Sequence, residues 1–295
     1  MRSERVLIVG ATGMLGEPVA RRLLADGWRV RCLVRNVPAA SAQLGDGFEY
    51  VQGDVTRPDT LDAAFDQCAY LHLNLRGTNT LESYELNEVQ GSATCIRLAH
   101  RHGFRRITYL SGAGRVDNDT RQYFPIRIKR AVEASLAAGR ISWTVFRATH
   151  FMESLNLCIR NGRAAILGHQ PHPLHYLAAS DYAGMAARAV DSGGAQNRAL
   201  YLFGPGAWTM KEALQRYVSV LRPDLRVQTL PLTAARLIGR VTRNQDLRFA
   251  AELFHAFSAI GEEGDPSEAN RLLGVPKTDL TQWLERCRRL KEERA

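Results

Sequence analysis

Three glycines at the end of a short apolar run are the clearest chemical signal in the sequence. Residues 6–9 are Val-Leu-Ile-Val, and glycines follow at intervals of three. A buried strand that turns sharply into a helix presents backbone amides at the positive end of the helix dipole, and glycine lets a pyrophosphate approach them. The pattern predicts a phosphate-binding turn, although a tight turn without a ligand could use the same residues. The expected contacts come from Gly10, Thr12, Gly13, Met14, Leu15 and Gly16.

The end of the second predicted strand, over residues 28–34, indicates which dinucleotide this turn would serve. Arg35 follows the strand, and no acidic residue lies between Asp26 and Asp46. Folds that prefer NAD place a carboxylate here to hold the ribose hydroxyls, whereas an arginine suits the 2′-phosphate of NADP. We therefore expect NADP rather than NAD as the cofactor. The alternative is that Arg35 is a surface residue of an arginine-rich chain.

Two further strand ends carry polar side chains toward the same edge. Asp54 and Val55 follow a strand over residues 48–52, and Asp54 could accept a hydrogen bond from an adenine amino group or cap the turn into a helix over 59–67. Asn74 stands near the end of a strand over residues 69–75. Ligands of open parallel sheets bind at the carboxyl ends of the strands, so we expect Asn74 beside the cofactor.

Lys129 is the residue whose chemistry best suits proton transfer. It is one of four lysines in a chain with 39 Lys and Arg residues, and it lies on a predicted helix over residues 125–138. A desolvated lysine can release its proton at a useful pH, whereas arginine cannot. Lys129 could anchor a ribose, act as a general acid or base, or be an exposed helix lysine.

The elements that must position these residues alternate regularly between strand and helix. A long helix is predicted over residues 84–102, and further strands over 107–110 and 143–146. This alternation predicts an α/β fold with a doubly wound parallel sheet. We expect a Rossmann domain over residues 1–150 and a smaller C-terminal α/β substrate subdomain over 151–295, some of whose segments could return to the sheet. The glycines, prolines and histidines of residues 162–173 predict a loop.

Composition excludes several other classes of protein. The 295 residues carry a formal net charge of +9, but there is no basic tail and no zinc-finger spacing, so we expect neither direct nucleic-acid binding nor a metal site. The five cysteines are scattered without a Cys-x-x-Cys pair, which is typical of reduced thiols in a cytoplasmic protein. The apolar run before the glycines is too short for a signal peptide or membrane span, and no membrane association is expected.

Taken together, these motifs resemble the extended and atypical short-chain dehydrogenase/reductases, and among them the NmrA-like group. The resemblance covers most of the chain. Its parts are Val-Gly-Ala-Thr-Gly-Met-Leu-Gly at 9–16, Leu-Val-Arg at 33–35, Gly-Asp-Val-Thr at 53–56, Asn87-x-x-x-Gly91, the strand ending in Ser111, Lys129-x-x-x-Glu133, Trp-Thr-Val-Phe-Arg at 143–147, Phe-Met-Glu at 151–153, Asp181-Tyr-Ala, and Gly204-Pro205.

The resemblance implies an NAD(P)-binding Rossmann domain and a small domain that closes over the nicotinamide. In standard members a Tyr-x-x-x-Lys pair supplies the chemistry: the lysine holds the nicotinamide ribose, the tyrosine acts as general acid or base, and a serine after the fifth strand steadies the substrate oxygen. Lys129 and Ser111 match the lysine and the serine, but Pro125 occupies the tyrosine position. Tyr123, on the preceding loop, is the candidate that could replace it.

Three functions follow from the resemblance. The first is an NADP-dependent oxidoreductase that transfers a hydride between NADPH and a small carbonyl, quinone or enone. The second, favoured by the missing tyrosine, is a non-catalytic NAD(P)-binding regulator or assembly protein. The third is a nucleotide-sugar epimerase or dehydratase, and both Pro125 and Arg35 argue against it.

The sequence does not identify the substrate of the first function. Residues 151–176 and 230–257 should shape the substrate pocket, but they carry no motif that names a ligand. His150 falls near the expected nicotinamide site, where a loop histidine can also be ordinary polar surface. We expect a small-molecule substrate and a monomer or homodimer.

Overall fold

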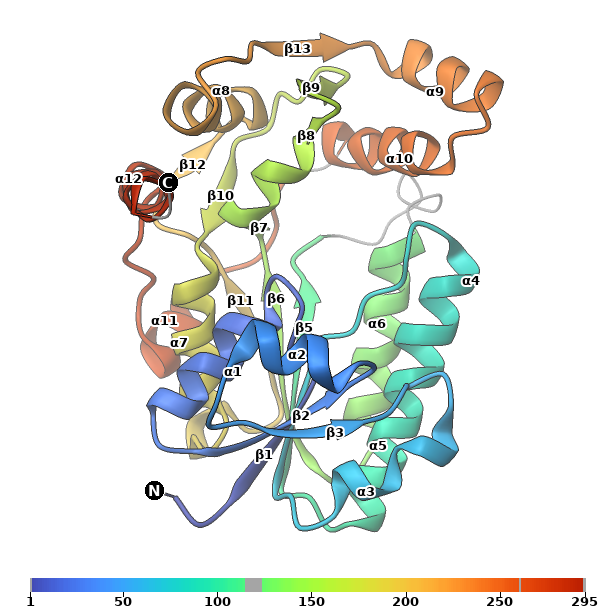
Figure 1. Ribbon diagram of the computed structural model, residues 1–295, viewed down its shortest axis with the longest axis vertical. Helices are drawn as coiled ribbons and strands as arrows, with labels where there is room; N and C mark the ends of the chain where they lie inside the picture. Colours follow the sequence, from blue (N-terminus) through green and yellow to red (C-terminus); the bar gives the residue numbers. More distant parts are fainter. Residues whose placement is uncertain (1, 115–123, 260, 294–295) are drawn as a thin grey trace.

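A seven-stranded parallel sheet forms the centre of the molecule (Figure 1). The computed structural model describes residues 2–114, 124–259 and 261–293. The strand order is β11-β6-β5-β4-β1-β2-β3, and every neighbouring pair is parallel. This confirms the predicted doubly wound sheet. The strands are β1 (Arg5–Val9), β2 (Arg29–Val34), β3 (Glu49–Gln52), β4 (Tyr70–Leu73), β5 (Arg106–Gly112), β6 (Ser142–Ala148) and β11 (Arg198–Leu202).

Helices cover both faces of this sheet, because its central strands are apolar on both sides. In β1, Ile8 packs into the core on one face while Leu7 and Val9 pack into the core on the other, and all three are buried. The first face carries α1 (Gly16–Ala25), α2 (Val37–Leu44), α7 (Ala179–Ala189) and α11 (Ser267–Leu273). The second face carries α3 (Asp62–Phe65), α5 (Gly91–Arg101) and α6 (Phe124–Ala137).

The strand order reverses at β1, and this reversal creates the binding crevice. The chain proceeds from β1 outward to β2 and β3 on one side, then returns to place β4, β5 and β6 on the other. The connections that leave β1 and β4 therefore diverge to opposite faces. In open α/β sheets, ligands bind in the crevice that this divergence leaves at the carboxyl ends of the strands.

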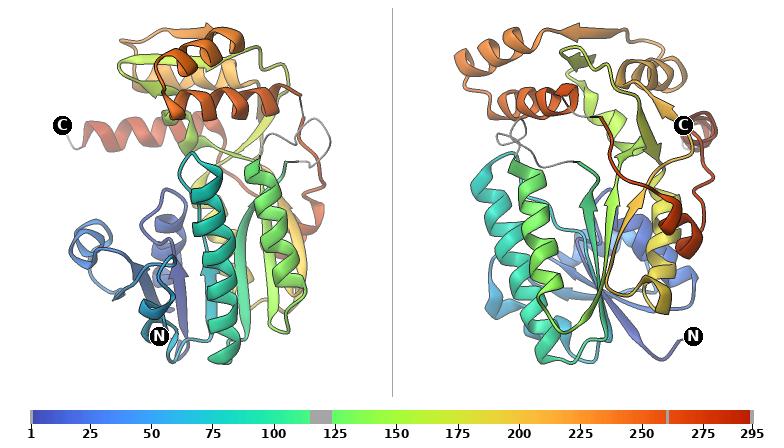
Figure 2. Two further views of the ribbon diagram at one scale, coloured as in Figure 1. Left: turned by 90° about the vertical axis from the view of Figure 1, so that its right-hand side faces the viewer. Right: turned by 180° about the vertical axis from the view of Figure 1, so that it is seen from behind.

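A second unit, which we call the upper lobe, lies above the carboxyl ends of the large sheet (Figure 2). Two three-stranded sheets, in the orders β12-β10-β7 and β13-β9-β8, share a core with four helices. Its strands are β7 (His150–Phe151), β8 (Ile159–Arg160), β9 (Arg163–Leu167), β10 (Leu174–Leu177), β12 (Ala207–Trp208) and β13 (Val227–Leu230). Its helices are α8 (Met210–Leu221), α9 (Leu232–Val241), α10 (Gln245–Ala259) and α12 (Leu280–Glu292).

The second half of the chain contributes to both units. The strand β11 pairs with β6 in the large sheet, and α7 and α11 pack on that sheet between segments that build the upper lobe. The division of the chain at residue 150 stays a prediction. Within the described part of the chain, no helix is both long and apolar enough to cross a membrane.

Three local expectations need correction. The predicted loop over 162–173 contains β9, whose Ala164 and Ile166 are buried and which pairs with β13, so tertiary contacts outweigh the flanking glycines. The predicted helix over 84–102 is a short α4 (Leu81–Tyr84), a π-helical segment η2 (Glu85–Gln90) and α5. The predicted helix over 59–67 is a 3₁₀ turn (Pro58–Thr60) followed by the four residues of α3.

Candidate functional site

The glycine turn is so tight that a Cβ atom at two of its three glycines would clash with nearby backbone atoms. Gly10 has φ +91°, and a Cβ atom there would lie 2.3 Å from the carbonyl oxygen of Asn74. A Cβ atom on Gly16 would lie 2.0 Å from the carbonyl oxygen of Gly10. By contrast, a Cβ atom on Gly13 would approach only the Gly10 oxygen, at 3.3 Å. Gly13 is therefore the position of the three that the turn itself constrains least.

The start of α1 fits an anion. The residue before the helix, Leu15, provides no side-chain hydrogen bond to the first amides of α1. The amides of Gly16 and Glu17 both donate to the carbonyl oxygen of Gly13 at 3.0 Å, so a phosphate group would be attracted by the positive end of the helix dipole and by the exposed turn before it. Thr12, Gly13 and Met14 are exposed along the turn. The residues present thus fit the pyrophosphate of a dinucleotide.

Asn74 meets this turn at the point where the strand order reverses. Its backbone amide donates to the carbonyl oxygen of Val9 at 3.0 Å, which extends the pairing of β1 and β4 by one residue. Its side-chain nitrogen lies where a Cβ atom on Gly16 would be 3.0 Å away. The structure therefore brings Asn74 and the glycine turn together, as the sequence indicates.

Arg35 and Asp54 lie at the neighbouring edge. Arg35 is exposed directly after β2, and Asn36 caps α2 by accepting a hydrogen bond from the amide of Ala39 at 3.0 Å. Asp54 accepts hydrogen bonds from the amide and the hydroxyl of Thr56 at 2.9 and 2.8 Å. Burial raises the pKa of Asp54, but the bonds from Thr56 and the charges of Arg35 and Arg57 outweigh it and hold that pKa below its ordinary value.

The Asp54 carboxylate bonds within its own turn, to Thr56. It does not cap the 3₁₀ turn that follows, whose N-cap residue is Arg57. A further bond to an adenine stays a prediction. The adjacent Val55 is buried against Gly91, where a Cβ atom would lie 3.0 Å from the valine side chain. The predicted contact of Val55 with the cofactor also stays a prediction.

Lys129 is not an ordinary exposed helix lysine. Its ammonium group forms an ion pair with Glu88, donates to the carbonyl oxygen of Leu110 at 3.1 Å and lies 5.2 Å from the centre of the Tyr109 ring. Glu88 is fully buried in the π-helical segment and also accepts the Tyr109 hydroxyl at 2.6 Å. Burial, together with the Glu88 carboxylate, raises the pKa of Tyr109 well above its ordinary value.

Ser111 is buried in a charged network on the α6 side of the sheet. Its hydroxyl donates to Glu133, which also forms ion pairs with Arg130 and Arg147. Arg130 further donates to the carbonyl oxygens of Gly112 and Gly114, at 3.1 and 2.8 Å, and so braces the segment after β5. Pro125 lies in the first turn of α6, where proline is tolerated. Tyr123 lies outside the described residues.

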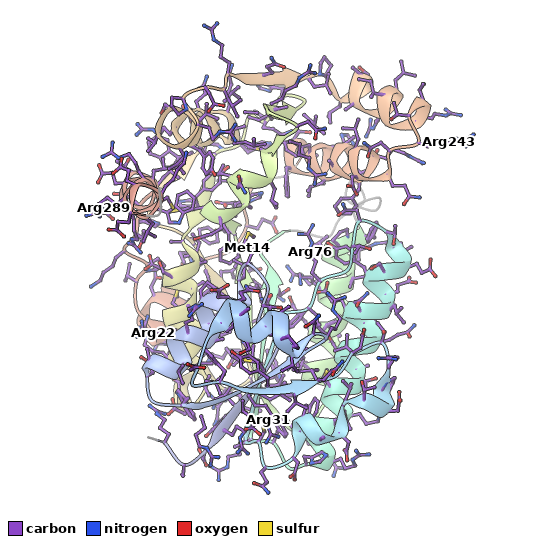
Figure 3. The ribbon with its side chains drawn as sticks, viewed as in Figure 1. Met14, Arg22, Arg31, Arg76, Arg243 and Arg289 are labelled. Carbon is purple, nitrogen blue, oxygen red and sulfur yellow. The ribbon has the colours of Figure 1, made fainter. Side chains whose placement is uncertain are left out.

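A cavity of about 400 Å³ separates the carboxyl ends of β5 and β6 from the upper lobe. In Figure 3, Met14 and Arg76 lie between the upper end of the large sheet and the upper lobe, and both line this cavity. Lys129 and Ser111 do not line it. The sheet side also contributes Gly112, Ala113, Gly114, Ile126, Ala148 and Thr149, and the upper lobe contributes His150, Leu157, Cys158, Phe249, Leu253, Phe254 and Phe257.

The aromatic wall from α10 is the part of the site that the sequence does not single out. Phe249, Leu253 and Phe257 recur every four residues, which places them on one helical face. That spacing is visible in the sequence, but a stripe of this kind is typical of a buried core face. His150 also lines the cavity, and burial lowers the pKa of its imidazole to about 4, so the ring is neutral near pH 7.

Comparisons with known proteins agree with this geometry. A sequence model of an NAD(P)H-binding family matches residues 10–166. The chain is 24% identical over 267 residues to the photosystem II assembly factor Ycf39 of Synechocystis, covering 88% of this chain and 81% of the relative. It is 30% identical over 239 residues to the (4-alkanoyl-5-oxo-2,5-dihydrofuran-3-yl)methyl phosphate reductase of Streptomyces griseus, covering 78% and 79%.

A solved structure supports the fold assignment independently. The NADPH complex of the NADPH-dependent quinone oxidoreductase from Escherichia coli superposes with a TM-score of 0.74. The comparison covers 96% of this chain and 99% of that one at 21% identity. At this level of identity the similarity shows a shared fold.

Proposed function

The chain belongs to the NAD(P)H-binding family, within the NmrA-like group of atypical short-chain dehydrogenase/reductases, and on this basis we propose that it is an NADP-dependent oxidoreductase. The proposed reaction transfers a hydride between NADPH and a small, largely apolar carbonyl compound, quinone or enone. The observation that carries the proposal is the cavity, which extends from Met14 of the glycine turn to the aromatic face of α10. A substrate there would lie beside the cofactor and away from bulk water.

The cofactor would be held by residues of four strand ends. The exposed glycine turn, at the positive end of the α1 dipole, would bind the pyrophosphate, and Arg35 would pair with the 2′-phosphate. Asp54 and Val55 would border the adenine, and Asn74 would lie beside the glycine turn. When bound, NADPH supplies the hydride.

Lys129 would hold the ribose next to the nicotinamide or serve as a general acid. Its ammonium group donates to the carbonyl oxygen of Leu110, two residues before the cavity-lining Gly112, and this proximity supports either role. Ser111 would have to turn away from Glu133 to reach a substrate oxygen. Both assignments, and that of Tyr123, remain proposals.

The test is NADPH oxidation across a panel of acceptors. We expect apolar quinones and enones such as menadione to be reduced, and charged or sugar-like carbonyls to react at least tenfold more slowly, because the cavity wall offers mainly carbon. Binding of NADPH without oxidation of any acceptor would contradict the proposal.

That contrary outcome would favour a second candidate, a protein that binds NADPH and docks to a protein partner. Its support is the similarity to an assembly factor and an exposed apolar surface on α9, where Leu237, Ile238 and Val241 are 63, 44 and 75% exposed. Arg240 is exposed on the same helix, and Arg243 is exposed in the turn just after it, where Figure 3 labels it. A partner for this surface would present an apolar patch bordered by acidic residues.

A further inference from the structure

Most polar side chains around the cavity already form hydrogen bonds within the protein. The Thr149 hydroxyl donates to the carbonyl oxygen of His175 at 2.6 Å, and Glu262 accepts from the amide of His175 at 2.8 Å. Asp246 accepts hydrogen bonds from Asn79 and Arg160, at 2.8 and 3.3 Å. The Ser154 hydroxyl donates to the carbonyl oxygen of Phe151, and Arg76 donates to the hydroxyl of Tyr84 at 3.1 Å.

His150 is the exception among them. Among the described residues, His150 and Cys158 are the polar side chains of the cavity wall that form no hydrogen bond to another residue. A ring N–H that faces a largely apolar cavity without a partner in the protein is free to donate to a molecule bound there. Such a group is stabilised when a bound molecule brings an oxygen atom to it.

The ring of His150 is also held in place. It lies one residue beyond the end of β6 and belongs to β7, which pairs with β10 so that His150 lies opposite Tyr176. Its ring lies 4.5 Å from the ring of Phe257 and 6.0 Å from that of Tyr176, edge to face in both cases. Two aromatic neighbours therefore fix the imidazole where the end of β6 meets the wall formed by α10. A fixed donor costs little reorganisation when a substrate binds.

We propose that His150 donates a hydrogen bond to the carbonyl oxygen of the substrate, and that the substrate is a flat, apolar carbonyl compound such as a naphthoquinone packed against Phe257. This inference rests on the proposed oxidoreductase function and deepens it. As the hydride adds, negative charge develops on the substrate oxygen, and a fixed N–H donor stabilises that charge. His150 keeps its ring proton, because a neutral imidazole that released it would become an anion, and the proton of the product comes from water.

The test compares two variants at position 150 with one matched control. His150→Phe removes the donor while keeping a ring beside Phe257, and His150→Gln keeps an N–H donor. His255→Phe is the control, because His255 is exposed on α10 and does not line the cavity. NADPH binding is measured by fluorescence and menadione reduction by NADPH absorbance. Far-ultraviolet circular dichroism verifies that each variant is folded.

We expect His150→Phe to lower kcat for menadione about 100-fold, the usual effect of removing one such donor. His150→Gln should retain kcat within about tenfold of wild type, and NADPH affinity should stay within twofold in all variants. If wild type reduces menadione and His150→Phe keeps kcat within twofold, the role of His150 is overturned while the oxidoreductase function stands. If wild type binds NADPH but reduces no acceptor, the function itself fails and the role of His150 falls with it.

Discussion

The ammonium group of Lys129 neutralises the carboxylate of Glu88 inside the protein. Glu88 is fully buried, and the Lys129 side chain is 20% exposed at the edge of the same cluster. The Oε2 atom of Glu88 has no hydrogen-bond partner among the described residues, so Lys129 and the Tyr109 hydroxyl carry the stabilisation of this charge. A lysine proposed for cofactor binding is therefore also part of the structural core.

This pairing predicts that Lys129→Met destabilises the folded protein, in addition to any effect on function. Removing one partner of a buried ion pair leaves an uncompensated charge and typically costs about 3–5 kcal/mol. The double variant Lys129→Met with Glu88→Gln should recover most of that loss, because it removes both charges. Urea denaturation of the wild type, both single variants and the double variant measures the coupling. Additive effects of the two substitutions would show that the pair does not act as a unit.

The glycine turn predicts a separation between folding and ligand binding. Gly10→Ala should destabilise the protein by more than about 1 kcal/mol, since the position combines a positive φ with a contact at 2.3 Å from the Asn74 oxygen. Gly13→Ala meets only the Gly10 oxygen at 3.3 Å and should fold with nearly wild-type stability.

Because the added methyl group of Gly13→Ala would lie on the exposed turn, we expect it to weaken NADPH binding at least tenfold. Thermal melts and NADPH fluorescence titrations of the two variants provide the measurements. Unchanged NADPH affinity in a folded Gly13→Ala protein would indicate that the glycines serve the turn alone.

His72 predicts how stability depends on pH. The side chain is 1% exposed on β4, its Nδ1 atom lies 2.9 Å from the Thr108 hydroxyl, and burial lowers its pKa from 6.5 to about 4. The unfolded chain therefore binds a proton below pH 6.5 that the folded protein does not bind until about pH 4. Stability should fall as the pH decreases through this window, by about 3 kcal/mol in total from this residue.

A His72→Gln variant isolates the contribution of this residue. Its free energy of unfolding should lie furthest below that of wild type at pH 7, and the difference should shrink as the pH approaches 4. Urea denaturation at half-unit intervals of pH gives the comparison. His102→Gln is the matched control, because His102 is a histidine near the surface whose ring lies 2.8 Å from Asp62. A difference between His72→Gln and wild type that stays constant with pH would contradict the assignment.

The large sheet could be predicted from the sequence because its strands are apolar on both faces and each is followed by a turn or helix signal. The failures occurred where distant contacts decide the local structure. The strand β9 exists because Ala164 and Ile166 pack in the upper lobe and pair with β13, which lies more than 50 residues later. The π-helical segment likewise carries a buried residue, Glu88, whose ion-pair partner Lys129 comes from another helix.

The candidate site also has a part that could be predicted from the sequence and a part that could not. Gly10, Gly16 and Asn74 could be placed from the sequence because strand order brings strand ends together whatever the side chains around them are. The cavity could not be predicted, because its wall combines the ends of β5 and β6 with α10. Packing in the upper lobe decides which face of α10 points inward. For the same reason, the sequence offers no sign that His150 faces an apolar cavity.

Arg35 gives the most direct prediction about the cofactor. It is exposed immediately after β2, and because Val34 pairs with Gln52, Arg35 and Asp54 follow neighbouring strand ends, where both could border one bound adenosine. A hydrogen bond between charged groups is worth about 1.5–3 kcal/mol, which corresponds to about 10- to 150-fold in affinity. Arg35→Ala should lose affinity for NADPH by such a factor and leave NADH binding within about twofold.

Arg29→Ala is the matched control for this measurement, because Arg29 is an exposed arginine at the opposite end of the same strand. It changes the net charge equally and should leave both affinities unchanged. Fluorescence titrations of wild type and both variants with NADPH and NADH, at one ionic strength, compare the four affinities. Equal losses for NADPH in both variants would mean that overall charge, rather than a contact at Arg35, attracts the cofactor. Failure of wild type to bind either dinucleotide at millimolar concentration would remove the basis for both candidate functions.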